Sequence, residues 1–312
     1  MIIRKAENED IPQIVDLLKQ SLGESLLEKS EKFWKWKHLD NPFGPSPVLV
    51  MEENKQILGV RAFLKWKFTD LGKQIKAGRA VDTAIHPSFQ GKGIFTRLTQ
   101  KLLEQVTKDG WALIYNSPNK QSLPGYLKMG WETWGKLPIQ IKPIIFPKKA
   151  QQQEGQDWEQ CSTLITKLEQ GASKPKSGIH TFLAPGYIRW RYEECPLITY
   201  SFITDGFSYL LFYRLKEGSK GTEFRIVDFF GTEDLKRSEM QQLQDRLKVQ
   251  IQKSGCRWVS ISGLYQNSFA SLSLGWLPAL PIGPQVTLRN LNLNSPPSDL
   301  PWEWSLGDLE LF

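Results

Sequence analysis

The chain has 312 residues, of which 40% are hydrophobic and 23% are charged. This balance is typical of a globular protein and excludes a collagen-like chain, a disordered tail or a disulfide-rich miniprotein. The net charge of +7 is unevenly placed, because residues 1–150 hold 24 basic and 15 acidic residues while residues 151–312 hold 16 and 18. The first half therefore favours an anionic ligand, although a solvated basic face is the ordinary alternative.

The elements of the first half alternate between helical and strand periodicity. Apolar residues at Ile11, Ile14, Val15, Leu18 and Leu22 predict a helix over 11–22. The other expected elements are a strand at 2–4, a helix at 31–39, strands at 48–52, 56–68 and 76–86, a helix at 93–108, a strand at 111–115, a helix at 120–129 and a closing strand at 132–141. Alternation of this kind predicts an α/β fold with a mixed central sheet flanked by helices.

The sequence repeats itself once. Four pairs of similar segments follow each other in the same order, and they are marked by Trp36 and Trp190, Pro42 and Pro196, Asp82 and Asp228, and Trp131 and Trp276. The offset falls from 154 to 145 along the chain, as a loop deletion in the second copy would produce. We therefore expect two copies of one fold, with a first domain over 1–145, a polar linker over 146–156 and a second domain over 157–312.

A short glycine-containing segment, Gln90–Phe95, is the strongest functional signal. Gly91 and Gly93 come directly before an amphipathic helix and after a strand that ends at His86 and Pro87. Such a loop directs backbone N–H groups and the positive end of a helix dipole at one anion. Glycines that serve only the turn geometry are the alternative. The segment has neither the P-loop pattern nor the dinucleotide fingerprint.

This segment resembles the signature Gln/Arg-x-x-Gly-x-Gly/Ala of the Gcn5-related N-acetyltransferases, with Phe95 in place of the last small residue. A second block of that family, Tyr-x-Lys-x-Gly-Phe, is similar to Tyr126–Trp131, and Asn119 matches an asparagine common before it. The resemblance covers residues 1–145. Together with the internal repeat, it implies two tandem folds of this family, the second of them degenerate.

The resemblance implies an N-acetyltransferase that moves an acetyl group from acetyl-CoA to a primary amine of an amino sugar, amine or amino acid, without a metal. In that family the loop N–H groups bind the pyrophosphate, the preceding strand binds the pantetheine arm, and Asn119 would bond the pantetheine or orient Tyr126. The implied coenzyme-binding residues are Thr83, Ala84, Ile85, Gln90, Gly91, Lys92, Gly93, Ile94, Phe95 and Asn119. Tyr126 is the implied general acid for the leaving thiolate.

The acceptor amine must lose a proton, and Asp82 is the candidate base. An ionisable residue inside an apolar strand is unusual unless it is paired or functional. An ion pair with Arg79 or with another basic group is the other interpretation of Asp82. His86 is a rival base, and water is a third proton acceptor.

The second copy lacks the glycine pair. Its corresponding segment, Gly231–Arg237, contains two carboxylates, which would repel a pyrophosphate, and Ser271 stands where Tyr126 would be expected. We therefore expect one coenzyme site per chain and a second domain that shapes the acceptor site. The aromatic and basic segments 33–38 and 187–192 either line the cleft between the domains or pack in the core.

Two other functions stay open. Tandem transferases of similar architecture use aminoacyl-tRNA as the donor, and a coenzyme-bound sensor or scaffold would have no acceptor chemistry. No lysine or arginine run is long enough for a nucleic-acid-binding arm, so a small-molecule amine is the expected partner.

Localisation is inferred from what the sequence lacks. No apolar run approaches the roughly 18–20 residues that span a membrane, and the N-terminal residues lack the apolar core of a secretory signal. Cys161, Cys195 and Cys256 show no CxxC spacing, which disfavours zinc and disulfides. These features predict a cytoplasmic protein.

Overall fold

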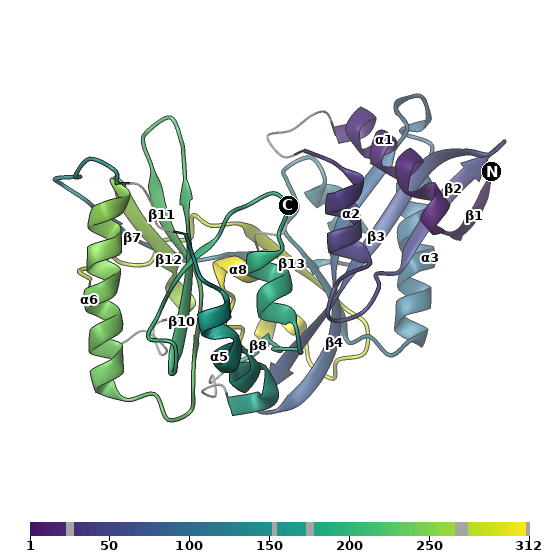
Figure 1. The fold of residues 1–312 in the computed structure, drawn as a ribbon. Coiled ribbons are helices and arrows are strands. Elements are labelled where there is room, and N and C mark those ends of the chain that lie inside the picture. Colours follow the sequence, from purple (N-terminus) through teal and green to yellow (C-terminus); the bar gives the residue numbers. More distant parts are fainter. Residues whose placement is uncertain (23–27, 152–154, 173–177, 266–273, 310–312) are drawn as a thin grey trace.

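A computed structural model describes residues 1–22, 28–151, 155–172, 178–265 and 274–309 (Figure 1). The first half contains β1 (Ile2–Lys5), α1 (Ile11–Leu22), α2 (Glu31–His38), β2 (Val48–Glu53), β3 (Gln56–Asp70), β4 (Lys73–Ile85), α3 (Ile94–Lys108), β5 (Leu113–Asn116), α4 (Leu123–Lys128), β6 (Glu132–Lys136) and β7 (Ile139–Pro143). The second half contains α5 (Ser162–Lys167), β8 (His180–Thr181), the helical segment η5 (Arg189–Glu193), β9 (Ser201–Thr204), β10 (Tyr209–Lys216), β11 (Glu223–Gly231), α6 (Arg237–Ser254), β12 (Trp258–Ser262), β13 (Gln285–Asn290) and α8 (Leu306–Leu309). The expected α/β class with mixed sheets is confirmed.

The strands of the described residues form two sheets that repeat one pairing scheme. The larger sheet has the order β1-β2-β3-β4-β5-β13-β6, with β8 on β3, and the smaller has the order β7-β12-β11-β10-β9. In the series β2-β3-β4-β5-β13 the pairs are antiparallel, antiparallel, parallel and antiparallel. The series β9-β10-β11-β12-β7 repeats that order of directions. In each half one helix, α3 or α6, links the two parallel strands.

The two halves exchange one strand each, which the sequence did not predict. The closing strand expected at 132–141 is in fact two strands, and the second, β7, pairs with β12 of the smaller sheet. In return β13 lies between β5 and β6 of the larger sheet. Pro138 stands between β6 and β7, where a residue without an N–H group interrupts the ladder. Sheet membership therefore does not divide at the linker expected over 146–156.

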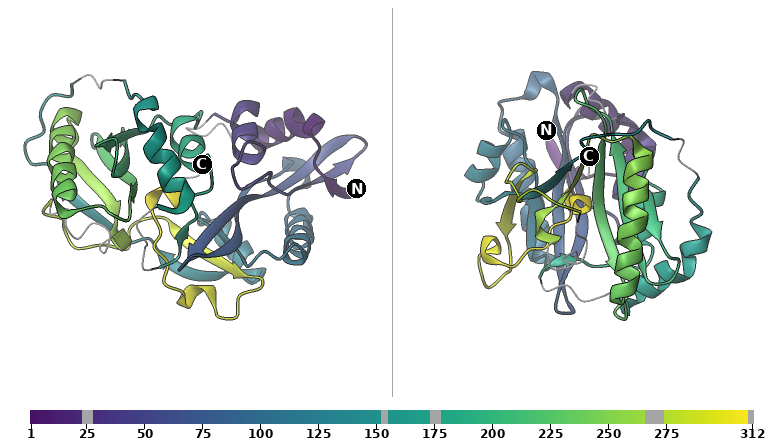
Figure 2. Two further views of the ribbon diagram at one scale, coloured as in Figure 1. Left: turned by 60° about the horizontal axis from the view of Figure 1, so that its bottom comes forward. Right: turned by 90° about the vertical axis from the view of Figure 1, so that its left-hand side faces the viewer.

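Helices cover both faces of the larger sheet. On one face α1 places Ile11, Ile14 and Leu18 against buried residues of β3 and β4. On the opposite face α3 packs Leu98 and Leu102 against the sheet. The helix α6 covers the outer face of the smaller sheet, as the right-hand view of Figure 2 shows. No helix of the described chain is long and apolar enough to cross a membrane.

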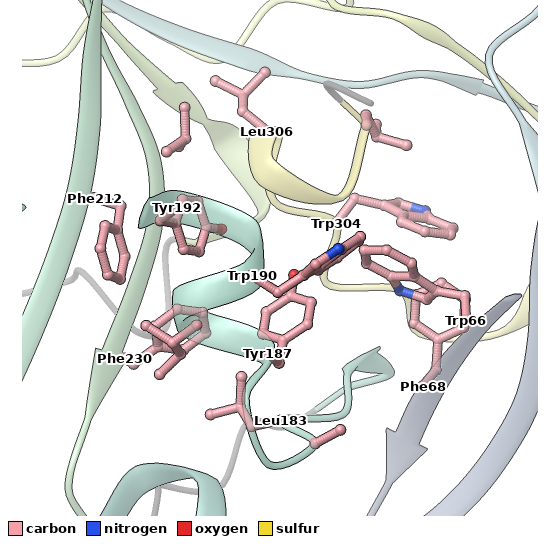
Figure 3. Packing of buried hydrophobic residues seen from close by; sticks show 14 of the residues in the cluster. Trp66, Phe68, Leu183, Tyr187, Trp190, Tyr192, Phe212, Phe230, Trp304 and Leu306 are labelled. Carbon is pink, nitrogen blue, oxygen red and sulfur yellow. The ribbon is translucent and has the colours of Figure 1, made fainter. Parts of the chain in front are cut away.

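A shared aromatic core joins the two sheets. Figure 3 shows Tyr187, Trp190 and Tyr192 between Phe212 and Phe230 of the smaller sheet and Trp66 and Phe68 of the larger one. These side chains belong to one continuous buried cluster, in which Trp66 and Phe68 are fully buried. The two sheets are therefore held together by a single core.

Two corresponding residues of the sequence repeat, Trp36 and Trp190, contact each other at the centre of this core. The indole rings of Trp36 and Trp190 stack with centroids 4.8 Å apart. Each indole Nε1 donates to the other residue's backbone carbonyl, at 2.8 Å in both directions. The aromatic side chains of 33–38 and 187–192 thus pack in the core, the second of the two roles considered for them.

Candidate functional site

The loop before α3 has the geometry of an anion-binding turn. Gly91 and Gly93 adopt φ values of +75° and +74°, which favour glycine, and a Cβ at either position would meet nothing within 4 Å. Gly93 is the N-cap of α3 and supplies no side-chain cap. The first helical bond runs from Arg97 N–H to the Gly93 carbonyl, so the N–H groups of residues 94–96 have no acceptor inside the helix.

The strand that leads into this loop separates from its neighbour. Strands β4 and β5 pair only from Ala77 with Leu113 to Arg79 with Tyr115, although β4 continues to Ile85. The edge of residues 83–85 that faces β5 is therefore unpaired within the described chain. The other edge of β4 stays bonded to β3, through Ala84 and Ile85. This opening lies directly between the loop and the short pairing with β5.

Tyr126 lies under the same face of the sheet as α3. Its side chain is 5% exposed, and its ring packs edge-on against Phe95 and Trp131 with centroids 5.7 and 5.1 Å away. Phe95, the departure from the family signature, packs beside Gly125, where an added Cβ would lie 3.4 Å from the Phe95 ring, an ordinary contact distance. The Tyr126 hydroxyl accepts a 2.9 Å hydrogen bond from Arg61 Nη1.

Asn119 holds a turn in this structure. Its Oδ1 accepts from the backbone N–H groups of Gln121 at 3.0 Å and of Ser122 at 2.8 Å. These bonds fix the chain where it enters α4, the helix that carries Tyr126. The hydroxyl of Tyr126 is held by Arg61, and the expected role of Asn119 toward the pantetheine stays a prediction.

Asp82 forms an ion pair with Lys37 and a hydrogen bond with His38, both on α2. Its carboxylate oxygen Oδ2 lies 2.9 Å from Lys37 Nζ and 2.8 Å from His38 Nε2. Both partners are almost fully buried, at 1% exposure. The ion-pair interpretation of Asp82 therefore holds, with Lys37 as the partner. Arg79 donates instead to the backbone carbonyls of Asp308 and Leu309.

The electrostatics of this cluster make Asp82 a weak proton acceptor. Burial alone would raise the pKa of Asp82, but the Lys37 ammonium and the His38 hydrogen bond outweigh it and hold that pKa well below its ordinary value. Burial lowers the pKa of Lys37 and of His38, and Asp82 opposes both shifts. Asp82 therefore stays a carboxylate at neutral pH.

His86, the rival base, has a local structural role. Its Nδ1 accepts from the Ser88 N–H at 3.3 Å, and its ring packs edge-on against Phe89. These contacts shape the turn that precedes Gln90. The Gln90 side chain in turn donates to the Ile85 carbonyl at 3.4 Å.

The equivalent helix start in the second half is occupied by the protein's own carboxylate. Glu239 Oε2 accepts from the Lys236 N–H at 2.6 Å, at the N-cap of α6. Asp234 pairs with Lys167 at 3.5 Å. Ser271, which the repeat places opposite Tyr126, lies outside the described residues.

A cavity of about 550 Å³ is bordered by His38, but by neither Tyr126 nor the loop before α3. It opens beside residues 65–67 of β3 and 76–77 of β4, at the opposite end of β4 from the loop, and is bordered by Lys5 and Lys76. It includes none of the coenzyme-binding residues expected from the sequence.

Three residues of the site were not anticipated from the sequence. Lys37 and His38 were noticed only as part of an aromatic and basic helix. Arg61 was not noticed at all, although it interrupts the apolar run 57–64 in the way that Asp82 interrupts its own strand. A charged residue inside a buried strand was the available signal in both cases.

Comparison with known protein families identifies one match, in the first half of the chain. Residues 2–134 match the family model described as acetyltransferase (GNAT) domain. A comparison with curated protein sequences finds no match.

Solved structures match nearly the whole chain. A Gcn5-related N-acetyltransferase of Anabaena variabilis is 18% identical with a TM-score of 0.64, over 93% of this chain and 73% of that one. A probable N-acyltransferase of Enterococcus faecalis is 13% identical with a TM-score of 0.64, over 93% and 72%. An N-myristoyltransferase of Saccharomyces cerevisiae with bound myristoyl-CoA is 10% identical with a TM-score of 0.52, over 93% and 78%.

At these identities the likeness to solved structures concerns the fold, and the family model adds the sequence evidence for the first half. The glycine loop and the separated strands β4 and β5 lie within the matched residues 2–134. Residues 2–134 therefore match an acetyltransferase (GNAT) domain in sequence, and the chain as a whole has the fold of solved structures described as Gcn5-related N-acetyltransferases.

Proposed function

We propose that this protein is an N-acetyltransferase that transfers an acetyl group from acetyl-CoA to the primary amine of a small molecule. The observation that carries the proposal is the start of α3, where two glycines with positive φ precede a helix end without a side-chain cap. Backbone N–H groups without acceptors, at the positive end of a helix dipole, suit a pyrophosphate.

The residues that would hold the coenzyme fit it. The backbone of Gln90–Phe95 would bind the pyrophosphate, and the unpaired edge of Thr83–Ile85 would bind the amide groups of the pantetheine. Open space beyond both glycine Cα atoms admits the phosphates without a clash. When bound, the coenzyme supplies an acetyl group activated as a thioester.

Tyr126 would protonate the departing thiolate. Arg61 has only donor groups, so the Tyr126 oxygen must be the acceptor in their 2.9 Å hydrogen bond. The hydroxyl proton of Tyr126 is therefore directed away from Arg61 and is free to be donated. A positioned acid of this kind accelerates such a step by about 10²–10⁴-fold.

Asp82 would hold Lys37 and His38 in place beside the site rather than take up a proton. Its lowered pKa makes the carboxylate a poor base but a permanent anion in the strand next to Thr83. Because Lys37 already pairs with this carboxylate, the role of Asp82 is to fix α2 against the strand that leads to the loop. We assign removal of the ammonium proton to water.

Titration calorimetry with acetyl-CoA tests the binding site. We expect one site per chain in the wild type and a loss of affinity of about 100-fold or more in Gly93→Glu, because the new carboxylate faces the pyrophosphate. Gly110→Glu is the matched control, since Gly110 ends α3 with the same φ of +74° and the same open space. Two sites per chain, or equal affinities for the two variants, would contradict the proposal.

Turnover separates the enzyme from the alternatives. Release of coenzyme A thiol from acetyl-CoA in the presence of primary amines supports the transferase. Binding without thiol release for any amine in the panel would support a sensor. Transfer from an aminoacyl-tRNA, with no affinity for acetyl-CoA, would support the aminoacyl transferase.

A further inference from the structure

Arg61 stands in β3 at the point where its pairing with β4 is irregular. The register runs from Val60 with Ala84 to Ala62 with Val81, so Arg61 faces two residues, Asp82 and Thr83, instead of one. Asp82 has a φ of +45°, a value that non-glycine residues rarely adopt. This bulge lies beside the opening between β4 and β5 and turns the Arg61 side chain toward Tyr126.

The guanidinium of Arg61 is a buried cation without a carboxylate partner. Its side chain is 0% exposed, and among the described residues no acidic group lies within ion-pair distance of it. Its Cζ lies 4.8 Å from the ring centroid of Phe63, 5.3 Å from that of Tyr126 and 5.6 Å from that of Phe95. These rings offset part of the cost of burying the charge, which is several kcal/mol for an unpaired ion.

The hydrogen bonds of Arg61 are incomplete in a way that points to a ligand. Nη1 donates to the hydroxyls of Tyr126 and Thr83. Nε and Nη2 are buried and have no acceptor in the part of the chain that the structure describes. Buried donors are nearly always satisfied, so two open donors on one buried cation need an explanation. In an arginine with a purely structural role, both terminal nitrogens of the guanidinium would be expected to donate hydrogen bonds. Arg79 shows this pattern, since its two terminal nitrogens donate to the carbonyls of Asp308 and Leu309.

We propose, on the basis of the function proposed above, that Arg61 is the positioning residue of the acyl-transfer step. By donating to the Tyr126 oxygen it forces the hydroxyl proton outward, toward the sulfur that leaves as a thiolate. Its positive charge favours the negative charge that the Tyr126 oxygen acquires when its proton leaves. The amine nitrogen forms its bond to the acetyl carbon, the carbon–sulfur bond then breaks, and the Tyr126 proton passes to the sulfur. The proton that water takes from the amine is returned through water to the Tyr126 oxygen.

The test is a double-mutant cycle between Arg61→Met and Tyr126→Phe, read as the kcat of thiol release from acetyl-CoA. We expect Arg61→Met to lower kcat about 100-fold, as misplacement of a catalytic group does. The double variant should be no slower than Tyr126→Phe within about twofold, because Arg61 acts through that hydroxyl. The affinity for acetyl-CoA should be unchanged, since the phosphate site lies elsewhere.

Thermal unfolding distinguishes this role from a structural one. Replacing an unpaired buried charge by an apolar side chain of similar length is neutral or stabilising, so Arg61→Met should melt at or above the wild-type temperature. Arg79→Met is the matched control, because it removes a buried arginine whose donors are filled. It should melt lower and show no coupling to Tyr126→Phe. Should Arg61→Met not fold, Arg61→Lys and Arg61→Gln carry the same cycle.

A kcat within about twofold of wild type in the Arg61 variants would overturn the inference, as would multiplicative losses in the cycle. Both results leave the proposed function intact, since the wild-type enzyme still releases thiol. A wild-type protein that binds acetyl-CoA but releases no thiol with any amine would overturn the proposed function and this inference together.

Discussion

The starts of α3 and α6 hold equivalent places in the two halves, and they differ in what faces their N–H groups. In α6 a carboxylate of the same helix, Glu239, accepts from the N-cap at 2.6 Å. In α3 the N-cap is Gly93, with no side chain to offer. The fold alone therefore does not make an anion site; the two helix starts differ in the carboxylate that lies at the start of α6 and in the two glycines with positive φ before α3.

The paired aspartates show the same divergence. Both Asp82 and Asp228 lie beside a bulge in the sheet register of their half. Asp82 is held by Lys37 and His38, whereas Asp228 accepts from the hydroxyls of Tyr192 at 2.6 Å and Ser305 at 3.1 Å. At the repeat offset of 154, His38 corresponds to Tyr192. The aspartate is thus held by basic side chains in one half and by hydroxyl groups in the other.

The largest expected effect concerns the acid, which the repeat does not preserve. Tyr126→Phe removes the hydroxyl and keeps the ring that packs on Phe95 and Trp131. We expect kcat to fall about 10²–10⁴-fold with nearly unchanged acetyl-CoA affinity, the pattern of an interaction made in the transition state. Single-turnover kinetics would show this, and a chemical rate within about twofold of wild type would remove Tyr126 from the mechanism.

The second effect separates the two aspartates. Asp82→Asn leaves Lys37 buried without its anion and should cost about 3–5 kcal/mol of unfolding free energy. Asp228→Asn weakens the hydrogen bonds from the Tyr192 and Ser305 hydroxyls and should cost about 1–3 kcal/mol. Urea unfolding at pH 7 measures both, and equal losses would contradict the difference drawn between the clusters.

The same variant has a pH signature. The folded pKa of Asp82 lies below its unfolded value of about 3.9, so its stabilisation is present above that pH and is lost as the pH falls through the folded pKa. The difference in unfolding free energy between wild type and Asp82→Asn should therefore shrink as the pH falls below about 4. A difference that stays constant down to pH 3 would argue that Asp82 acts through packing.

A smaller effect tests the symmetry at the centre of the core. Trp36→Phe and Trp190→Phe each remove one indole donor and leave one buried carbonyl unsatisfied, at about 1–3 kcal/mol. Because the two bonds are reciprocal, we expect equal losses within about 0.5 kcal/mol and a double variant that loses less than the sum. If chemical denaturation gave losses of unfolding free energy that differ several-fold, the two bonds would have the same geometry but would not contribute equally to stability.

The smallest expected effect concerns Glu239, and it tests whether this carboxylate alone prevents the start of α6 from binding the coenzyme. Glu239→Ala should cost about 1 kcal/mol of stability. Acetyl-CoA should still bind at one site per chain in calorimetry, because the segment 231–237 lacks the pair of glycines with positive φ. A second binding event in this variant would show that the cap, and not the loop, decides where the coenzyme binds.

Local features of the fold were predictable from the sequence. The helix at 11–22, the glycine loop and the strand before it follow from periodicity and turn chemistry, which are properties of neighbouring residues. The sequence shows that Trp36 and Trp190 hold corresponding places in the repeat. It does not show that they are in contact, because a sequence gives no distance between residues 154 positions apart.

Pairing over long distances was not predictable. The segment 139–143 is apolar enough for either sheet, so its sequence does not say that β12 is its partner. In the candidate site, the ion pair of Asp82 was foreseen as a class, but its partners come from a helix 44–45 residues earlier. The pairing of Arg61 with Tyr126 spans 65 residues and depends on the bulge that turns the side chain.

The exchange of β7 and β13 makes the two halves a single cooperative unit. A fragment that ends at residue 145 would lack the strand that lies between β5 and β6, and the remaining fragment would lack the edge strand next to β12. Neither piece contains all the strands of its own sheet, so each would expose unpaired strand edges. If the folded chain were cut within the linker, the two fragments would stay associated, because each contributes a strand to the other's sheet. The half without the glycine loop is therefore a structural requirement of the half that has it, because it supplies the strand between β5 and β6.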